Sequence, residues 1–195
     1  MLTTSSILAE QLQNYSDSAG KIMRMADEGS LFRLTRGLYE TDPDTPGHCL
    51  AGAIYGPSYL SFEYALSVYG LIPEAVHAYT SATFGKRKKK EYNNIFGRFT
   101  YRDVPEDVYP YGIVILEENG YPYQMATREK ALCDKLYTMP PVSGIRDLEL
   151  MLFDDLRIDE DEFSGLDSHD ILQIGEKYRC DNLKYLMKYM GRRSS

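Results

Sequence analysis

The chain has 195 residues, of which 43% are hydrophobic and 26% charged. Such a composition is typical of a globular protein, and the length allows one good core, or a small module plus a main domain, but not two full-sized domains. The formal net charge of −7 argues against a protein that coats nucleic acid without sequence preference, and the lack of a long apolar run or a signal-peptide pattern predicts a cytoplasmic protein.

Residues 1–42 predict a small head made of two helices and a β-ribbon. Hydroxyl residues followed by apolar residues at helical spacing indicate a first helix over residues 3–13. A second helix is expected to begin near Asp17 and to end at Gly29, because aspartate caps helix N-termini and glycine commonly follows their C-termini. The alternating segment 31–38 then predicts an extended ribbon, with its two arginines on opposite faces, as a candidate wing.

A turn-rich segment, TDPDTPG at residues 41–47, is the predicted hinge between the head and a body that covers residues 47–195. The body is expected to begin with a helix over residues 57–70, since proline and serine precede its apolar pattern and a glycine ends it. A short apolar run over residues 75–82 and two strand-like pieces around Gly97 follow.

The second half of the body predicts a hairpin and then helices. Asn119-Gly120 between runs of β-formers is a strong hairpin signal, and Thr127 is placed to cap the helix that follows. Two helical stretches, 144–157 and 169–190, are expected on either side of an acidic linker, Asp159–Glu162. Because helices and strands do not alternate regularly, the predicted class is α+β, with a helical C-terminus.

Charge is distributed unevenly along the body. Residues 86–102 contain seven Lys or Arg and one Glu, whereas residues 147–170 contain ten acidic residues and one basic residue. This asymmetry is compatible with different partners at the two ends of the body.

No pattern of residues indicates catalysis. Neither glycine-rich phosphate loop, G-x-x-x-x-G-K-[ST] or G-x-G-x-x-G, occurs. His48, His77 and His169 lie far apart, and His48 beside Cys49 is the nearest approach to a metal pair, with few soft ligands to complete a tetrahedral set. We therefore assign no catalytic residue, no metal and no cofactor.

The remaining candidate groups favour structural roles. The three cysteines are widely spaced and odd in number, which predicts reduced and mostly buried thiols. The acidic run 154–163 lacks the glycine and the spaced oxygen ligands of a calcium loop and is interpreted as a solvated face. Glu117-Glu118 and Glu129-Lys130 match the carboxylate and lysine set of metal-dependent nucleases in a few letters only, so a nuclease is the least favoured hypothesis.

Four blocks of the chain resemble a known family. The head segment KIMRMADEGSLFRLTRGLYE is similar to a stretch of the AbiEi-type antitoxins and their transcriptional-regulator relatives, and PSYLSFEYALSVYGLIPE resembles a block of their body. SATFGKRKKKEYNNIFGRFTYRDV and MATREKALCDKLY look like the segments that follow. The blocks occur in the family's order and cover roughly residues 20 to 140.

The resemblance implies a winged helix-turn-helix head on a mixed α/β antitoxin body. It also implies autoregulation of a two-gene operon through operator DNA, and a partner toxin of the nucleotidyltransferase type. In a winged helix the second helix of the motif enters the major groove and the wing touches the backbone or the minor groove. The residues that would contact DNA are Ser18, Lys21 and Arg24 at spacings of three on the second helix, and Arg33 and Arg36 on the wing.

Two alternatives stay open at this point. The basic run Lys86, Arg87, Lys88, Lys89 and Lys90 is interpreted as a patch for an acidic toxin, as a second phosphate-contacting patch, or as a solvated loop. The head, which has only about 30 residues before its wing, is either a DNA binder or a vestigial module that takes part in protein–protein interaction. The oligomeric state is not predicted.

Overall fold

The runs of β-forming residues in the middle of the chain assemble into one six-stranded sheet in the computed structural model, which describes residues 1–193. The strand order is β6-β7-β5-β4-β9-β8. Their bounds are β4 Tyr59–Leu60, β5 Ala78–Thr83, β6 Lys90–Asn94, β7 Gly97–Asp103, β8 Ile113–Glu118 and β9 Tyr121–Ala126. The sheet is mixed, because hairpins β6–β7 and β8–β9 are antiparallel whereas β5 and β7, and β4 and β9, run parallel.

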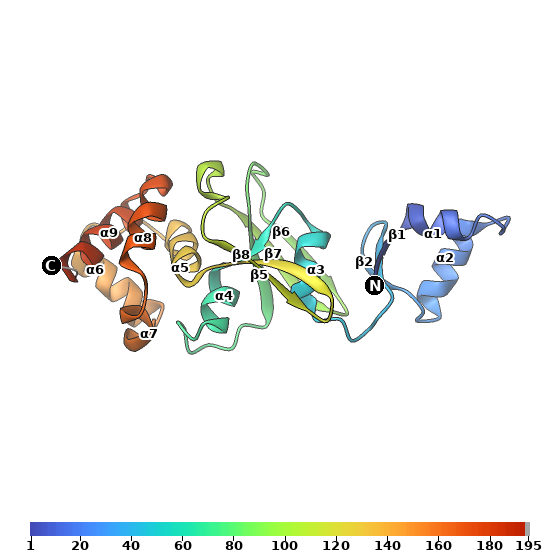
Figure 1. The fold of residues 1–195 in the computed structure, drawn as a ribbon, viewed down its shortest axis with the longest axis horizontal. Helices are drawn as coiled ribbons and strands as arrows, with labels where there is room; N and C mark the ends of the chain where they lie inside the picture. Colours follow the sequence, from blue (N-terminus) through green and yellow to red (C-terminus); the bar gives the residue numbers. More distant parts are fainter. Residues whose placement is uncertain (194–195) are drawn as a thin grey trace.

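Helices cover the sheet and form the end of the described chain. Those within the sheet region are α3 Gly47–Ile54, α4 Phe62–Val68, the 3-10 turn Glu106–Val108 and α5 Arg128–Tyr137. Those that follow are α6 Ile145–Glu149, the π-helical turn Leu150–Asp155, α7 Glu160–Ser164, α8 Ser168–Gly175, the 3-10 turn Glu176–Tyr178 and α9 Asp181–Arg193. Figure 1 shows this helical group at one end of an elongated molecule, with α5 between it and the sheet. The predicted α+β class with a helical C-terminus is confirmed.

One continuous apolar core joins the sheet to the helical end. Its almost completely buried members include Leu50, Phe62, Leu66, Phe99, Tyr101, Leu132, Leu136, Leu148, Leu152, Phe163, Leu183 and Leu186. Burying an aliphatic or aromatic side chain of this size contributes about 1.5–3 kcal/mol relative to leaving it in water. The sheet and the C-terminal helices therefore stabilise one another.

The head lies at the opposite end of the molecule from the C-terminal helices (Figure 1). Its elements are β1 Leu2–Thr4, α1 Ser5–Gln11, α2 Ser18–Asp27, β2 Phe32–Thr35 and β3 Leu38–Glu40. The strands form an antiparallel sheet in the order β1-β3-β2. A small core of its own, Leu8, Ile22 and Leu31, holds α1 and α2 against this sheet.

The head is packed on the body. Leu34 of β2 is buried in the main core, and the Phe32 ring meets the Phe96 ring edge to face, with 6.2 Å between the centroids. The amide of Asn94 donates a hydrogen bond of 3.2 Å to the carbonyl of Leu34. The head thus packs against the turn of hairpin β6–β7. The predicted domain boundary at residues 42–47 stays a prediction.

Several local predictions are confirmed because they rest on short-range chemistry. The carboxylate of Asp17 caps α2 by accepting the Gly20 N–H, and Gly29 takes the left-handed φ of +75° that ends the helix. Asn119 and Gly120 have φ of 52° and 79°, as a two-residue hairpin turn requires. The hydroxyl of Thr127 accepts the N–H of Lys130 and begins α5. All three cysteines are free, and two of them are buried.

Two predicted helices begin later than expected. The first starts at Ser5 rather than at residue 3, because residues 2–4 form β1 and pair with β3. The helix expected from residue 57 starts at Phe62, because Tyr59 and Leu60 form β4 in the middle of the sheet, where both side chains are almost completely buried. Pairing with β5 and β9 outweighs the helical pattern of the segment.

Helix α3 was not predicted at all. Its glycines, Gly47 and Gly52, lower the local helix propensity, and the burial of Leu50 and Ile54 against the sheet compensates for it. Gly47 itself is required by packing, because a Cβ atom there would lie 2.5 Å from the carbonyl oxygen of Phe96.

Two secondary-structure predictions for residues 159–190 were also wrong. The predicted acidic linker Asp159–Glu162 is the start of α7, since the Asp159 carboxylate accepts the N–H groups of Asp161 and Glu162 in the first turn of the helix. The helix predicted over 169–190 is two helices, because Arg179 adopts a left-handed φ of 52° between α8 and α9.

Candidate functional site

Helix α2 carries three of the predicted DNA-contacting residues on one side. Ser18, Lys21 and Arg24 follow one another at spacings of three, so they lie along the same face. Arg24 is exposed, and Ser18 and Lys21 are half-buried. Neither Lys21 nor Arg24 takes part in an ion pair within residues 1–193, which leaves both cations available to an external anion.

Of the two wing arginines, one lies in an extended segment as the sequence predicted and the other does not. Arg33 is an exposed residue of β2, but Arg36 lies in the turn between β2 and β3 and not in an extended segment. The reason is that Gly37, with φ of +77°, reverses the chain directly after Arg36, and its carbonyl accepts the N–H of Ser5. The turn is thereby held against the start of α1.

Arg33 faces the junction of head and body. It lines a hollow of about 480 Å³ together with Met23 and Asp27 of α2 and with Ile95 from the turn of β6–β7. Met23 and Ile95 are each 67% exposed, so this hollow has an apolar rim. The structure therefore places Arg33 beside the C-terminal half of α2 and Arg36 at a separate turn.

The head is not rich in positive charge. Residues 1–42 contain four Lys or Arg and six Asp or Glu. Three of the carboxylates accept backbone N–H groups: Asp17 caps α2, the buried Glu40 accepts those of Thr41 and Asp42, and Asp42 accepts that of Asp44. Any attraction for phosphate must therefore come from local geometry rather than from the net charge.

The basic run Lys86–Lys90 lies in the connection from β5 to β6 and ends on the first residue of β6. Its first two residues are anchored, since the Lys86 ammonium lies 5.3 Å from the centre of the Tyr55 ring and the Arg87 N–H donates to the Asp103 carboxylate. The three lysines that follow are exposed. Arg87, Lys88 and Lys89 line a hollow of about 360 Å³ with Arg102 and Thr138.

A buried carboxylate, Asp134 of α5, organises the centre of the body. It accepts hydrogen bonds from the hydroxyls of Tyr59 at 2.9 Å, Ser61 at 2.7 Å and Tyr178 at 2.5 Å. The residues come from β4, from the segment just before α4 and from the 3-10 turn between α8 and α9. One side chain thus ties the sheet to the C-terminal helices.

Lys130 completes this network one helical turn before Asp134. Its ammonium lies 3.1 Å from the Asp134 carboxylate and donates to the Val108 carbonyl at 3.0 Å, and both charged side chains are 0% exposed. Burial lowers the pKa of Lys130, and the nearby Asp134 opposes that shift. Because solvent cannot reach either group, the pair acts as a structural element.

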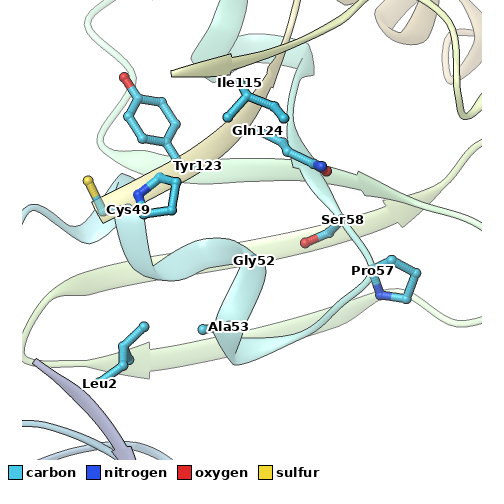
Figure 2. A pocket seen from close by; sticks show the side chains of 10 residues that line it. Leu2, Cys49, Gly52, Ala53, Pro57, Ser58, Ile115, Tyr123 and Gln124 are labelled. Atoms are coloured by element: carbon cyan, nitrogen blue, oxygen red, sulfur yellow. The ribbon is translucent and has the colours of Figure 1, made fainter. Parts of the chain in front are cut away.

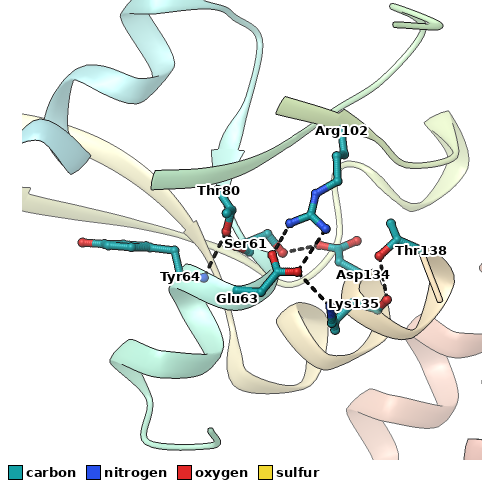
Figure 3. A network of polar contacts seen from close by, with 8 residues as sticks. All are labelled: Ser61, Glu63, Tyr64, Thr80, Arg102, Asp134, Lys135 and Thr138. Atoms are coloured by element: carbon teal, nitrogen blue, oxygen red, sulfur yellow. Dashed lines mark hydrogen bonds and ion pairs between the residues drawn. The ribbon is translucent and has the colours of Figure 1, made fainter. Parts of the chain in front are cut away.

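A second charged cluster, drawn in Figure 3, lies next to Asp134 and is partly exposed. The Arg102 guanidinium binds both oxygens of Glu63, and the Lys135 ammonium donates to the same carboxylate at 2.8 Å. Burial alone would raise the pKa of Glu63, but its bonds to Arg102 and Lys135 lower it to about 2. The first turn of α4 is fastened in this way to β7 and α5.

We expect Glu63 to make stability depend on pH in the acid range. Its folded pKa of about 2 lies below the ordinary 4.5, so the stabilisation is complete above 4.5 and is lost as the pH falls through this window. With the side chain 28% exposed, the effect is about 2 kcal/mol. The free energies of unfolding of the parent chain and of Glu63→Gln, measured with denaturant, should differ near neutral pH and converge at about pH 2. A difference independent of pH would contradict this assignment.

Other candidate groups for catalysis are not brought together. Glu129 accepts the backbone N–H of Asp167, whereas Glu118, at the exposed tip of hairpin β8–β9, lies 3.0 Å from the His48 ring nitrogen. Burial and the charge of Glu118 raise the pKa of the Cys49 thiol to about 11, which makes it a poor nucleophile. Among residues 1–193 no group of three His, Cys, Asp or Glu side chains is placed to hold a metal ion.

A groove of about 390 Å³ separates the first strand of the head from the body. Figure 2 shows it between α3 and the β8–β9 hairpin, with Leu2 at one side and Ile115 and Gln124 at another. The buried hydroxyl of Ser58 points into the groove and has no hydrogen-bond partner within the described residues. The lining is mostly apolar, and it contains no nucleophile paired with a base.

Sequence reasoning missed the body network. The signal was present as Lys130 and Asp134, four residues apart in a helix whose intervening residues, Ala131, Leu132 and Cys133, are apolar. Charged residues at that spacing on a buried helix pair with each other. Their partners in β4 and near α9 could not be known before the fold.

No protein-family model and no curated protein matches this chain. No helix within residues 1–193 has both the length and the apolarity to cross a bilayer.

Proposed function

We propose that this chain is an AbiEi-type, antitoxin-like regulator of the cytoplasm that acts by binding rather than by catalysis. Its head contacts operator DNA, and its body counteracts a nucleotidyltransferase-type toxin. The observation that carries the first part is the order of the head, β1-α1-α2-β2-β3 with a β1-β3-β2 sheet. A helix pair followed by a hairpin packed on a small sheet is the arrangement that winged helix-turn-helix domains use.

The chemistry of α2 supports DNA contact. It is the second helix of the pair, and it presents Lys21 and Arg24 without internal partners. In such a motif this helix enters the major groove, where Arg and Lys contact guanine or phosphate and Ser18 serves as a short donor or acceptor. We expect Arg36, at the turn of the hairpin, to contact the backbone of the duplex, as the wing of such a domain does.

The blocks that resemble the AbiEi type meet in the folded body. Three of these blocks supply most of the side chains drawn in Figure 3, among them Ser61 and Glu63 from one, Arg102 from the next and Asp134 with Lys135 from the last. The resembling segments therefore form a single packed unit.

A second candidate function is a protein–protein interaction module with a vestigial head. Two observations favour it: residues 1–42 contain more acidic than basic residues, and Leu34 anchors the head in the main core. In that case the basic run Lys86–Lys90, of which residues 87–90 are exposed, is the surface for an acidic partner.

The repressor function is tested by a band shift with the full chain and a duplex from upstream of its own reading frame. At about 50 mM salt we expect a specific complex. The affinity should fall as salt is added, and the slope of log affinity against log salt should be proportional to the number of phosphate contacts. A scrambled duplex of equal length is the control. No complex at low salt with the folded chain, or equal affinity for both duplexes, would exclude operator recognition.

The antitoxin function is tested by growth. Co-expression with the neighbouring reading frame is expected to relieve the growth arrest which that frame causes alone. Relief without operator binding would favour the interaction module, and no relief would remove the antitoxin function.

A further inference from the structure

The two edges of the six-stranded sheet differ in chemistry. The β6 edge reads Lys-Glu-Tyr-Asn-Asn, and its lysine, glutamate and polar residues are the kind that discourage pairing with another strand. The β8 edge begins with four aliphatic residues, Ile113, Val114, Ile115 and Leu116, and continues without proline, lysine or bulge. Ile115 is 73% exposed. Within the described residues the β8 edge therefore carries its only charges, Glu117 and Glu118, at its end, and its first four residues lack protection against pairing.

The free backbone groups of β8 follow from its hairpin. The two-residue turn makes Glu118 and Tyr121 a hydrogen-bonded pair, and such pairs alternate with non-bonded ones. Pro122, which has no N–H, lies opposite Glu117 and fits a non-bonded pair. Ile113, Ile115 and Glu117 consequently direct their N–H and C=O groups away from β9, toward the open edge.

We propose that β8 pairs antiparallel with β8 of a second copy of this chain, around a two-fold axis at Ile115. Ile115 then faces the partner's Ile115, and Ile113 faces the partner's Glu117. Val114 faces the partner's Leu116 on the other side of the sheet. The two six-stranded sheets become one continuous sheet.

The strand is complementary to itself in this register. Only outward-directed residues can form the hydrogen-bonded pairs, and centring on Ile115 is the one arrangement that pairs all three of them with one another. Moving the centre to Glu117 would set two carboxylates face to face, which is unfavourable. With Ile115 at the centre, each Glu117 lies opposite an isoleucine.

Self-pairing also predicts the symmetry of the DNA site that the head recognises, and this step rests on the proposed function. A two-fold dimer presents two copies of α2, and dimeric helix-turn-helix proteins bind two half-sites arranged as an inverted repeat. The pairing itself is measured without DNA, so its failure and the failure of operator binding are separate results.

The first test is the mass of the full chain by sedimentation equilibrium. We expect the mass to rise from 22.3 kDa toward twice that value with increasing concentration. Ile115→Lys, which sets two ammonium groups across the axis, is expected to remain monomeric. Asn93→Lys places the same charge at an exposed position of the β6 edge and is expected to dimerise like the parent chain. A parent chain that stays monomeric, or an Ile115→Lys chain that still dimerises, overturns the proposal.

The second test fixes the register by cross-linking. Cα atoms of a directly opposed hydrogen-bonded pair lie about 5.5 Å apart, within the range that a disulfide spans. In a Cys180→Ser background, with the other two cysteines buried, Ile115→Cys is expected to oxidise to a covalent dimer, while Ile113→Cys is not. Cross-linking at residue 113 but not at 115 would overturn the register, and cross-linking at neither would overturn the pairing.

Discussion

Replacing Asp134 by alanine is expected to lower the free energy of unfolding by about 3–5 kcal/mol. The change leaves the Lys130 ammonium buried without its counter-ion. It also removes the common acceptor of the Tyr59, Ser61 and Tyr178 hydroxyls. Since this network joins β4, α5 and the turn before α9, the loss should appear in one cooperative transition, measured by denaturant unfolding followed by circular dichroism.

Two further variants separate the charge effect from the loss of volume. The double change Lys130→Met with Asp134→Leu removes both charges and is expected to cost less than Asp134→Ala alone, because no unpaired charge remains. Asp154→Ala, at an exposed position, should stay within about 0.5 kcal/mol of the parent chain. If Asp134→Ala costs no more than this exposed control, the buried pair is not what holds the body together.

Removing the charges of Lys21, Arg24, Arg33 and Arg36 together is expected to weaken operator binding on the order of 100-fold or more at about 0.1 M salt. Each cation that neutralises one phosphate contributes about 0.9 to the salt slope, so four alanines should reduce the slope by about 3–4. The measurement is a salt series of band shifts or fluorescence anisotropy with the upstream duplex.

A matched control removes equal charge at the other end of the molecule. Arg146, Lys184, Lys188 and Arg192 are exposed on the C-terminal helices, and their replacement by alanine lowers the net charge by the same amount. We expect this variant to keep nearly all of the affinity and slope of the parent. Equal losses in the two variants would mean that the head reads no DNA and that binding follows overall charge.

Local chemistry explains which elements could be predicted. Aspartate at the start of α2, the Asn119-Gly120 turn and the threonine before α5 form hydrogen bonds or take backbone angles that depend on a few neighbouring residues. These elements are present where the pattern placed them. Strand β4 and helix α3 were missed because their burial, rather than their propensity, decides their structure.

The candidate contact residues of the head show the same division. The spacing of Ser18, Lys21 and Arg24 is a property of any helix, so their common face was predictable. The position of Arg33 depends on the β6–β7 turn that meets the head, and that of Arg36 on a two-residue reversal held by α1. The contact with the β6–β7 turn has no signature near Arg33 in the sequence, whereas Gly37, directly after Arg36, is a local signal for the reversal.

The sequence by itself determined the α+β class, the helix pair of the head, the β8–β9 hairpin and the free cysteines, because periodicity, caps and turn residues act over short distances. Only the tertiary structure decided that Lys130 and Asp134 meet Tyr59 and Tyr178, that the head is packed on the body, and that β8 is left as an open apolar edge. These features depend on residues that are far apart in the chain. Which of them meet is decided by what the fold buries and by the order of the strands in the sheet.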